Sequence, residues 1–367
     1  LYLAGNNMWA YAPEYIYFEE EWRPVPSTRP GRKPGGEDNW MAGGYTCPAS
    51  SYTDFFTAAL EKLVEQEDVR GLYFDQTHCL PCKNHAHGCG YTGPDGERQT
   101  VVPVLARREF HKRVYTIMKQ HHPKSLISIH MSGHPFMGWW SFCDMMATGE
   151  QWATGLGRQV AAGGPGNYHS IMPLDATRAE FMGHNWGPVQ VFLTEFSAAE
   201  PGESYPNRQN PFGARYFRDE RLDEIYHVAG IFALHDMILP WPFRCNQMPF
   251  RRTRRAMETL GLDETVEYVP YWDNDEYVKL YVGEEKDGET HFKRVNLPGE
   301  ERVVCAIYRK PGRELFVVMN NSDRDIEHVK LAIEYEALGH RPQLAPRMDD
   351  ALSGAMYGYQ GKKDEVI

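Results

Sequence analysis

The chain has 367 residues, 42% of them hydrophobic, and a formal net charge of −11. A typical domain has about 150 residues, so we expect two domains, or one barrel of about 250 residues with a smaller partner. The apolar content excludes a globally disordered chain. The acidic balance argues against a nucleic-acid partner, because that affinity depends on clustered Lys and Arg. The one basic run, 251–255, is expected to be a solvated helix face.

The sequence contains no membrane-spanning pattern. No stretch approaches the ~20 consecutive apolar residues that cross a bilayer, so we expect no membrane partner. Residues 1–8 show neither the basic segment nor the hydrophobic run of a signal peptide. The chain does not begin with Met, as expected of a mature form or an excised fragment, so the missing signal does not argue against export.

The first elements are weakly marked. Tyr15–Glu19 allows an early strand, residues 24–38 form a loop rich in Pro, Gly and Arg, and residues 40–47 resemble a strand. Residues 51–65 then combine capping residues with apolar positions at helical spacing, which predicts a helix. Residues 40–65 therefore form one β-α unit, and one or two barrel strands before it can be missing or supplied by a preceding segment.

Strand and helix patterns then alternate, for about six β-α repeats in all. The expected strands are 71–75, 125–130, 141–150, 189–195 and 237–241, and the expected helices are 104–120, 175–184 and 218–234. This alternation predicts a parallel sheet covered by helices, and polar residues at the strand ends favour the catalytic face of a (β/α)8 TIM-type barrel. A doubly wound sheet is the rival. The sequence has neither a Gly-rich dinucleotide fingerprint nor a phosphate-binding loop, so we favour the barrel.

The pattern changes after about residue 265. Period-two strands without intervening helices occupy 277–282, 302–308, 314–319 and 328–333, which predicts a small antiparallel β-sandwich. The expected organisation is a (β/α)8 catalytic barrel over residues 1–262, a β-sandwich over 263–345 and a polar tail over 346–367. The barrel can be incomplete at its N-terminus, with one or two strands missing or supplied by a preceding segment.

Several motifs together resemble the catalytic part of glycoside hydrolase 123-like proteins. They are the run Gly71 to Asp75, the loop from Cys82 to Tyr91, His130 to Gly133, Gly149-Glu150, and Tyr271 to Asn274 ahead of the β-sandwich. The resemblance covers residues from about 40 to 335.

The resemblance implies a (β/α)8 glycosidase, usually bacterial and exported, with a further β-sandwich before the barrel. In that family an adjacent Asp-Glu pair acts on N-acetylgalactosaminides, and the Asp steadies the substrate's acetamido group. This chain has Asp75-Gln76 at the matching strand end. An amide cannot donate a proton on demand, so the resemblance does not carry that substrate over to this chain.

Glycosidic bond cleavage usually takes two carboxyl groups, one as acid and the other as nucleophile or base. Asp75, Glu150 and Glu195 all stand at predicted strand ends. We expect Asp75 to be the nucleophile or base and Glu150 the general acid, with Glu195 as its replacement. The structural alternatives are an Asx turn at Asp75 and salt-bridged carboxylates at the other two positions.

Polar and aromatic side chains near these acids suit a carbohydrate substrate, because flat rings pack well against sugar C–H faces. The residues expected to bind substrate are Asn84, His85, His87, His130, Trp152, Trp186 and His235. Core packing explains most aromatic residues in any protein. We expect no cofactor, an extracellular or periplasmic location, and a carbohydrate as the partner; the sequence does not define the oligomeric state.

The loop after Asp75 carries Cys79, Cys82, His85, His87 and Cys89. It permits a zinc site, a disulfide such as Cys82 with Cys89, or packed thiols. The spacing matches no standard zinc finger, so we expect no metal ligands and interpret the loop as a shaped cleft wall. Two other functions stay open: a catalytically silent carbohydrate-binding barrel, and a zinc hydrolase that uses this loop.

Overall fold

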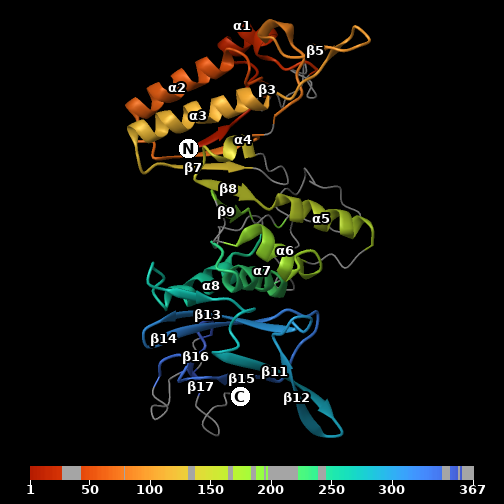
Figure 1. Ribbon diagram of the computed structural model, residues 1–367, viewed down its shortest axis with the longest axis vertical. Coiled ribbons are helices and arrows are strands. Elements are labelled where there is room, and N and C mark those ends of the chain that lie inside the picture. The colour runs from red at the N-terminus through yellow and green to blue at the C-terminus, as the bar shows by residue number, and fades with distance from the viewer. Residues whose placement is uncertain are drawn as a thin grey trace. The chain divides into compact units, whose positions relative to one another are not determined.

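The computed structural model describes residues 1–26, 43–77, 79–130, 137–163, 168–182, 187–193, 196, 222–238, 245–340, 348–353 and 356–357. The chain forms two compact units. The first consists of Leu1–Thr148 and His184–Val191, and the second of Gly149–Gly183 and Phe192–Ile367. Figure 1 shows the elements of both, coloured from red at the N-terminus to blue at the C-terminus.

The parallel sheet contains β1 (Tyr2–Ala4), β4 (Gly71–Asp75), β7 (Leu126–His130), β8 (Met145–Thr148) and β9 (Val189–Phe192), adjacent in that order. β1 pairs with β4, β4 with β7, and β7 with β8, each in parallel. The order in space follows the order in the chain, whereas a doubly wound sheet reverses at a switch point. The predicted parallel α/β sheet is therefore confirmed, and its closure into an eight-stranded barrel stays a prediction.

Two helices cover one face of this sheet. They are α2 (Tyr52–Gln66) and α3 (Val104–His121), which lie side by side in Figure 1 and match the predicted helices. Leu60 and Val64 of α2 and Phe110 of α3 share one buried cluster with Leu72 and Phe74 of β4. Because side chains alternate along a strand, Leu72 and Phe74 face these helices while Tyr73 and Asp75 face the opposite side.

One expectation for the N-terminal region was wrong, and another was confirmed only in part. Tyr15–Glu19 is not a strand but part of α1 (Pro13–Trp22). Its aromatic residues favour a strand locally, yet Pro13 suits the first turn of a helix, and Tyr15 and Trp22 fall on one face and are buried together. The expected strand at 40–47 is β3 (Gly43–Tyr45) in its described part, and it pairs antiparallel with β2 (Asn7–Trp9) rather than joining the parallel sheet.

The segment between β4 and α3 contains little regular structure. It includes the 3-10 turn η2 (His85–His87), β5 (Tyr91–Thr92) and β6 (Arg98–Gln99). The short helix α4 (Met137–Trp140) precedes β8. The expected strand at 141–150 ends at Thr148, and Glu150 is the first residue of the next helix instead of a strand end.

The helices of the second unit surround an aromatic core. They are α5 (Glu150–Ala161), the 3-10 turn η3 (Tyr168–Ser170), α6 (Leu174–Phe181), α7 (Leu222–Leu234) and α8 (Met248–Glu258). Phe181, Phe192 and Phe232 are buried together there. The basic run falls on α8, where Arg251, Arg252 and Arg255 are exposed, as predicted. None of the described helices is long and apolar enough to cross a membrane.

The predicted C-terminal β domain is confirmed as two three-stranded antiparallel sheets. One contains β10 (Glu267–Val269), β13 (Val303–Lys310) and β14 (Arg313–Asn320), and the other β11 (Val278–Lys286), β12 (Glu289–Val295) and β15 (Val329–Ile333). β13 is buried on both faces: Val304 and Ala306 join the helical core, while Cys305 and Ile307 join the core between the sheets. Two short strands, β16 (Met348–Asp349) and β17 (Met356–Tyr357), pair near the end of the chain.

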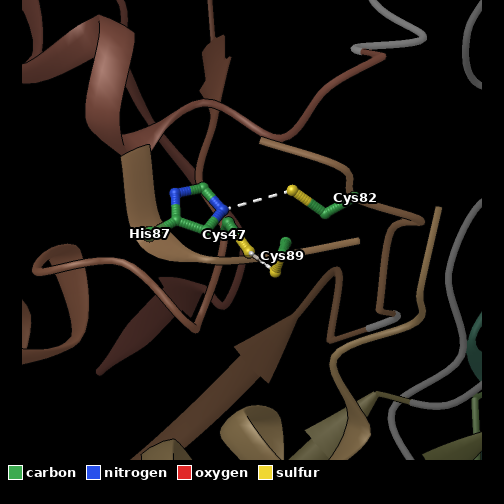
Figure 2. A group of neighbouring side chains, drawn as sticks. All are labelled: Cys47, Cys82, His87 and Cys89. Atoms are coloured by element: carbon green, nitrogen blue, oxygen red, sulfur yellow. Dashed lines mark hydrogen bonds between the residues drawn. The ribbon is translucent and has the colours of Figure 1, made fainter. Parts of the chain in front are cut away.

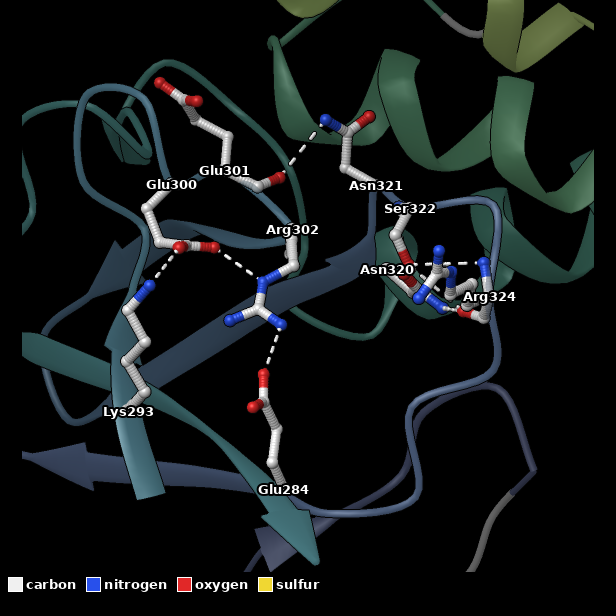
Figure 3. Close-up of polar contacts among 9 residues, drawn as sticks. All are labelled: Glu284, Lys293, Glu300, Glu301, Arg302, Asn320, Asn321, Ser322 and Arg324. Atoms are coloured by element: carbon white, nitrogen blue, oxygen red, sulfur yellow. Dashed lines mark hydrogen bonds and ion pairs between the residues drawn. The ribbon is translucent and has the colours of Figure 1, made fainter. Parts of the chain in front are cut away.

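The turns of this β domain carry a polar network, drawn in Figure 3. Glu300 accepts hydrogen bonds from Lys293 at 2.7 Å and from Arg302 at 2.6 Å, and Arg302 also donates to Glu284 at 2.8 Å. Surface ion pairs of this kind contribute about 0.2–1 kcal/mol each. The network therefore fixes the geometry of the turns more than it stabilises the fold.

Candidate functional site

Polar side chains gather at the carboxyl ends of three adjacent strands of the first unit. Asn6 and Asn7 follow β1, Asp75 ends β4 and Gln76 follows it, and His130 ends β7. Parallel strands bring their carboxyl ends to the same edge of a sheet. Asp75 and His130, each expected at a strand end, therefore lie at the same edge of the sheet.

Asp75 is held by three donors. Its Oδ1 accepts hydrogen bonds from His130 Nδ1 at 2.9 Å and from the Gln76 backbone N–H at 2.6 Å, and its Oδ2 accepts one from the Tyr2 hydroxyl. Burial raises the pKa of Asp75, but the hydrogen bonds from His130 and Tyr2, with the remaining contacts, hold it at about 2. The carboxylate is therefore ionised at neutral pH, and His130 Nδ1 carries the proton that they share. Such a group can act as a nucleophile or base and not as a general acid.

An aromatic pair lies beside this carboxylate. Tyr2 stacks on Tyr73 with ring centroids 5.5 Å apart, and Tyr73 lies 6.2 Å from the His130 ring. Tyr73 shares the face of the sheet with Asp75, opposite α2 and α3. Sequence reasoning missed both tyrosines. The alternation within residues 71–75 could have indicated Tyr73, but Tyr2 comes from a strand that the sequence barely marks.

The backbone after Asp75 is strained. Gln76 has φ of 52°, in the left-handed region that costs a non-glycine residue about 1–2 kcal/mol. Its side-chain oxygen accepts a hydrogen bond from Asn7 Nδ2, and its N–H is directed at Asp75. Strain of this kind persists where surrounding contacts over-determine it, and it clusters at functional sites.

Further hydrogen bonds fix the position of the strand ends. Thr77 Oγ1 donates to the His130 carbonyl at 2.6 Å, and the Gly5 N–H donates to the Asp75 carbonyl at 2.7 Å. The buried Arg107 donates from Nη1 to the Gly5 carbonyl at 2.7 Å. The three strand ends are therefore held together independently of any ligand.

Glu150 begins α5 in the second unit, directly after Gly149. Gly149 has φ of 140°, and a Cβ there would lie 2.8 Å from the Leu193 carbonyl oxygen, so this turn requires glycine. Trp152 is partly buried against the core of the same unit. The roles predicted for Glu150 and Trp152 stay predictions.

A second carboxyl group in this unit escaped the sequence reasoning. Glu180, within α6, accepts a hydrogen bond from Gln151 Nε2 at 2.6 Å, and burial raises its pKa. A raised pKa is what a general acid requires. No sequence signal pointed to Glu180, because it lies inside a helix rather than at a strand end.

The remaining predicted residues have different environments. Glu195 and Trp186 lie outside the described residues. His235 is completely buried, its Nδ1 donates to the Ile231 carbonyl at 2.7 Å, and burial lowers its pKa to about 4. Asp144, directly before β8, pairs with Lys119 at 2.9 Å. His235 is thus placed as a core histidine, and its contact with substrate stays a prediction.

Asn84 and His87 of the loop after Asp75 bond to the end of α1. Asn84 donates both amide hydrogens to the carbonyls of Glu20 and Arg23, at 2.9 and 2.7 Å, and its Oδ1 accepts from Ala86 N–H at 2.9 Å. His85 is exposed. His87 points instead toward three cysteines (Figure 2). Asn84 therefore has no amide hydrogen left for a sugar, and substrate binding by His85 and His87 stays a prediction.

No protein-family profile matches this chain. No curated protein matches it in sequence. A maltogenic alpha-amylase, AmyB from Thermotoga neapolitana, is 11% identical with a TM-score of 0.49, over 97% of this chain and 71% of that one. An alpha-amylase from Geobacillus thermoleovorans, complexed with acarbose, is 10% identical with a TM-score of 0.30, over 83% and 64%. Both similar structures are alpha-amylases; neither similarity assigns the family or activity of this chain.

Proposed function

We propose that this protein is a glycoside hydrolase that cleaves O-glycosidic bonds of an oligosaccharide or polysaccharide. The observation that carries the proposal is Asp75, an ionised carboxylate at the carboxyl end of β4 with Tyr2 and Tyr73 beside it. An ionised carboxylate supplies the nucleophile or the base for water, and the tyrosine rings supply flat surfaces for a sugar.

In this proposal His130 and Tyr2 position Asp75. Their hydrogen bonds favour the ionised form, and the Gln76 N–H adds a third donor. The leaving oxygen needs a proton from another group, because Asp75 is deprotonated. Glu150 is proposed as that acid from its place in the sequence, with Glu195 as its replacement.

The test is hydrolysis of a panel of aryl glycosides and polysaccharides by the purified chain. On any substrate that is cleaved, Asp75→Asn is expected to reduce kcat by at least about 100-fold, as the loss of a nucleophile or base does. Asp68→Asn is the matched control, because Asp68 is an exposed aspartate of the same unit that pairs with Arg70. Full activity of both Asp75→Asn and Glu150→Gln in folded protein would refute the assignment.

A catalytically silent carbohydrate-binding protein is the second candidate. Gln76 favours it, since an amide stands beside Asp75 and its oxygen is already bonded to Asn7. Binding of an oligosaccharide without turnover, weakened in Tyr73→Ala but not in Asp75→Asn, would support this second function over the first.

A further inference from the structure

Four potential metal ligands from distant parts of the chain converge in the first unit. They are the Sγ atoms of Cys47, Cys82 and Cys89 and a ring nitrogen of His87, all within 4.8 Å of one another. Figure 2 shows the four side chains turned toward a common centre. Cys47 follows β3, whereas the other three residues belong to the loop after β4.

The distances fit a single tetrahedral ion. Cys47 Sγ and Cys89 Sγ are 3.9 Å apart, and Cys82 Sγ lies 3.2 Å from His87 Nε2. With Zn–S of about 2.3 Å and Zn–N of about 2.0 Å, tetrahedral geometry requires S···S and S···N separations of about 3.8 and 3.5 Å. The other four separations are within 4.8 Å, so the side chains need to approach by at most about 1 Å to surround one ion.

The surroundings prepare His87 to bind a metal. Its Nδ1 lies 2.6 Å from the Glu21 carbonyl oxygen, which only accepts hydrogen bonds, so Nδ1 carries the proton. In the neutral ring Nε2 is then the unprotonated nitrogen, and it faces the cysteines. A metal-binding histidine typically donates its other N–H to a carbonyl or carboxylate in this way, which fixes the tautomer and the orientation of the ring.

The cysteines are equally well placed. Cys47, Cys82 and Cys89 are buried, and the Asn84 N–H donates to Cys82 Sγ at 3.4 Å. Gly88, with φ of 74°, gives the backbone the left-handed turn that brings His87 and Cys89 to the same centre. All seven cysteines of the chain are described and are free thiols, so the disulfide considered from sequence is not formed.

We propose that Cys47, Cys82, His87 and Cys89 form a structural zinc site. Soft thiolates and an imidazole in a tetrahedral set are the ligands that favour Zn²⁺. Each cysteine binds the ion as a thiolate, so a thiol that becomes a ligand releases its proton. Four protein ligands leave no position for water, so the site fastens the loop and does not catalyse hydrolysis. This inference does not depend on the proposed glycosidase activity.

The zinc site joins three segments that have little regular structure to hold them. Cys47 secures the segment between β3 and α2, His87 is hydrogen-bonded to the end of α1, and Cys82 and Cys89 close the loop that follows Asp75. Small or loop-rich regions often replace a missing apolar core with such a metal. The ligand set also differs from the one considered from sequence, because Cys79 and His85 are outside it.

The experiment measures zinc in the full chain by inductively coupled plasma mass spectrometry, after purification with zinc supplied and then desalting. About one zinc ion per chain is expected. His87→Gln and Cys89→Ser should each reduce it at least tenfold, while the matched controls His85→Gln and Cys79→Ser should retain it. X-ray absorption of the zinc-loaded wild type should show three sulfur ligands and one nitrogen ligand.

The wild-type measurements keep the inference falsifiable if the ligand variants fail to fold. Cobalt substitution should give thiolate charge-transfer bands and the intense visible bands of a tetrahedral ion. Zinc near zero in the wild type, oxygen-rich coordination, or a Cys47–Cys89 disulfide found by mass spectrometry would overturn it. Equal zinc in the ligand variants and their controls would do the same, because the metal would then be bound elsewhere.

Discussion

His235 gives the sharpest quantitative prediction, because burial keeps it neutral in the folded state. It is 0% exposed, and burial, with the charge of Arg178 acting in the same direction, lowers its pKa from 6.5 to about 4. As pH falls, the unfolded chain takes up this proton first, so stability decreases from about pH 6.5 downward and the loss is complete below about pH 4. Each unit of difference between the folded and unfolded pKa corresponds to 1.36 kcal/mol of unfolding free energy. The difference at His235 therefore gives a total of about 3 kcal/mol.

The perturbation is His235→Gln, which keeps an N–H donor but removes the titrating ring. Between about pH 7 and pH 4.5, wild type should lose about 2 kcal/mol more of its unfolding free energy than the variant does. Urea unfolding followed by tryptophan fluorescence at both pH values measures this difference. His328→Gln is the control, because the His328 side chain is 43% exposed, and it should follow wild type within about 0.5 kcal/mol.

An identical pH dependence in wild type and His235→Gln would refute the reasoning. It would mean that His235 is hydrated or protonated in the folded state, as a residue lining an open binding cleft would be. The same experiment therefore separates a core histidine from the substrate contact expected from sequence.

Three other predictions concern stability. Asp75→Asn should lower the free energy of unfolding at pH 7 by about 2 kcal/mol, because the folded-state pKa of Asp75 is about 2 and its ordinary pKa is 3.8. Urea unfolding at several pH values should show this difference from wild type shrinking as pH falls from 3.8 to 2. Gln76→Gly should be about 1 kcal/mol more stable than Gln76→Ala in urea, since both lose the side chain but only Gly accepts φ of 52° freely; equal stabilities would contradict the strain. Asn274→Ala should lower the free energy of unfolding by about 2 kcal/mol in a thermal experiment. The buried Asn274 donates a hydrogen bond to the Cys305 carbonyl and accepts one from Asn296 at 2.9 Å, and the variant loses both. A loss below about 0.5 kcal/mol would show that water replaces these bonds.

The spacing of apolar residues along the chain was enough to predict much of the fold. Residues 71–75 and 104–120 formed the expected strand and helix, and the period-two runs after residue 265 formed antiparallel sheets. Residues 71–75 and 104–120 each bury one face against a neighbour, so their apolar spacing records their conformation. The strand prediction for Tyr15–Glu19 was wrong. Its aromatic residues suit a strand, but Tyr15 and Trp22 pack together on one face of a helix.

The sequence by itself determined that Asp75 ends a buried strand, that a polar loop follows, and that an antiparallel β domain occupies residues after about 265. Only the tertiary structure decided what Asp75 contacts, because the order of strands in the sheet places Tyr2 and His130 beside it. The same holds for Cys47, which joins Cys82, His87 and Cys89 while Cys79 does not. Spacing along a chain encodes the conformation of one segment, but partners from separate segments meet only when packing of the whole unit brings them together.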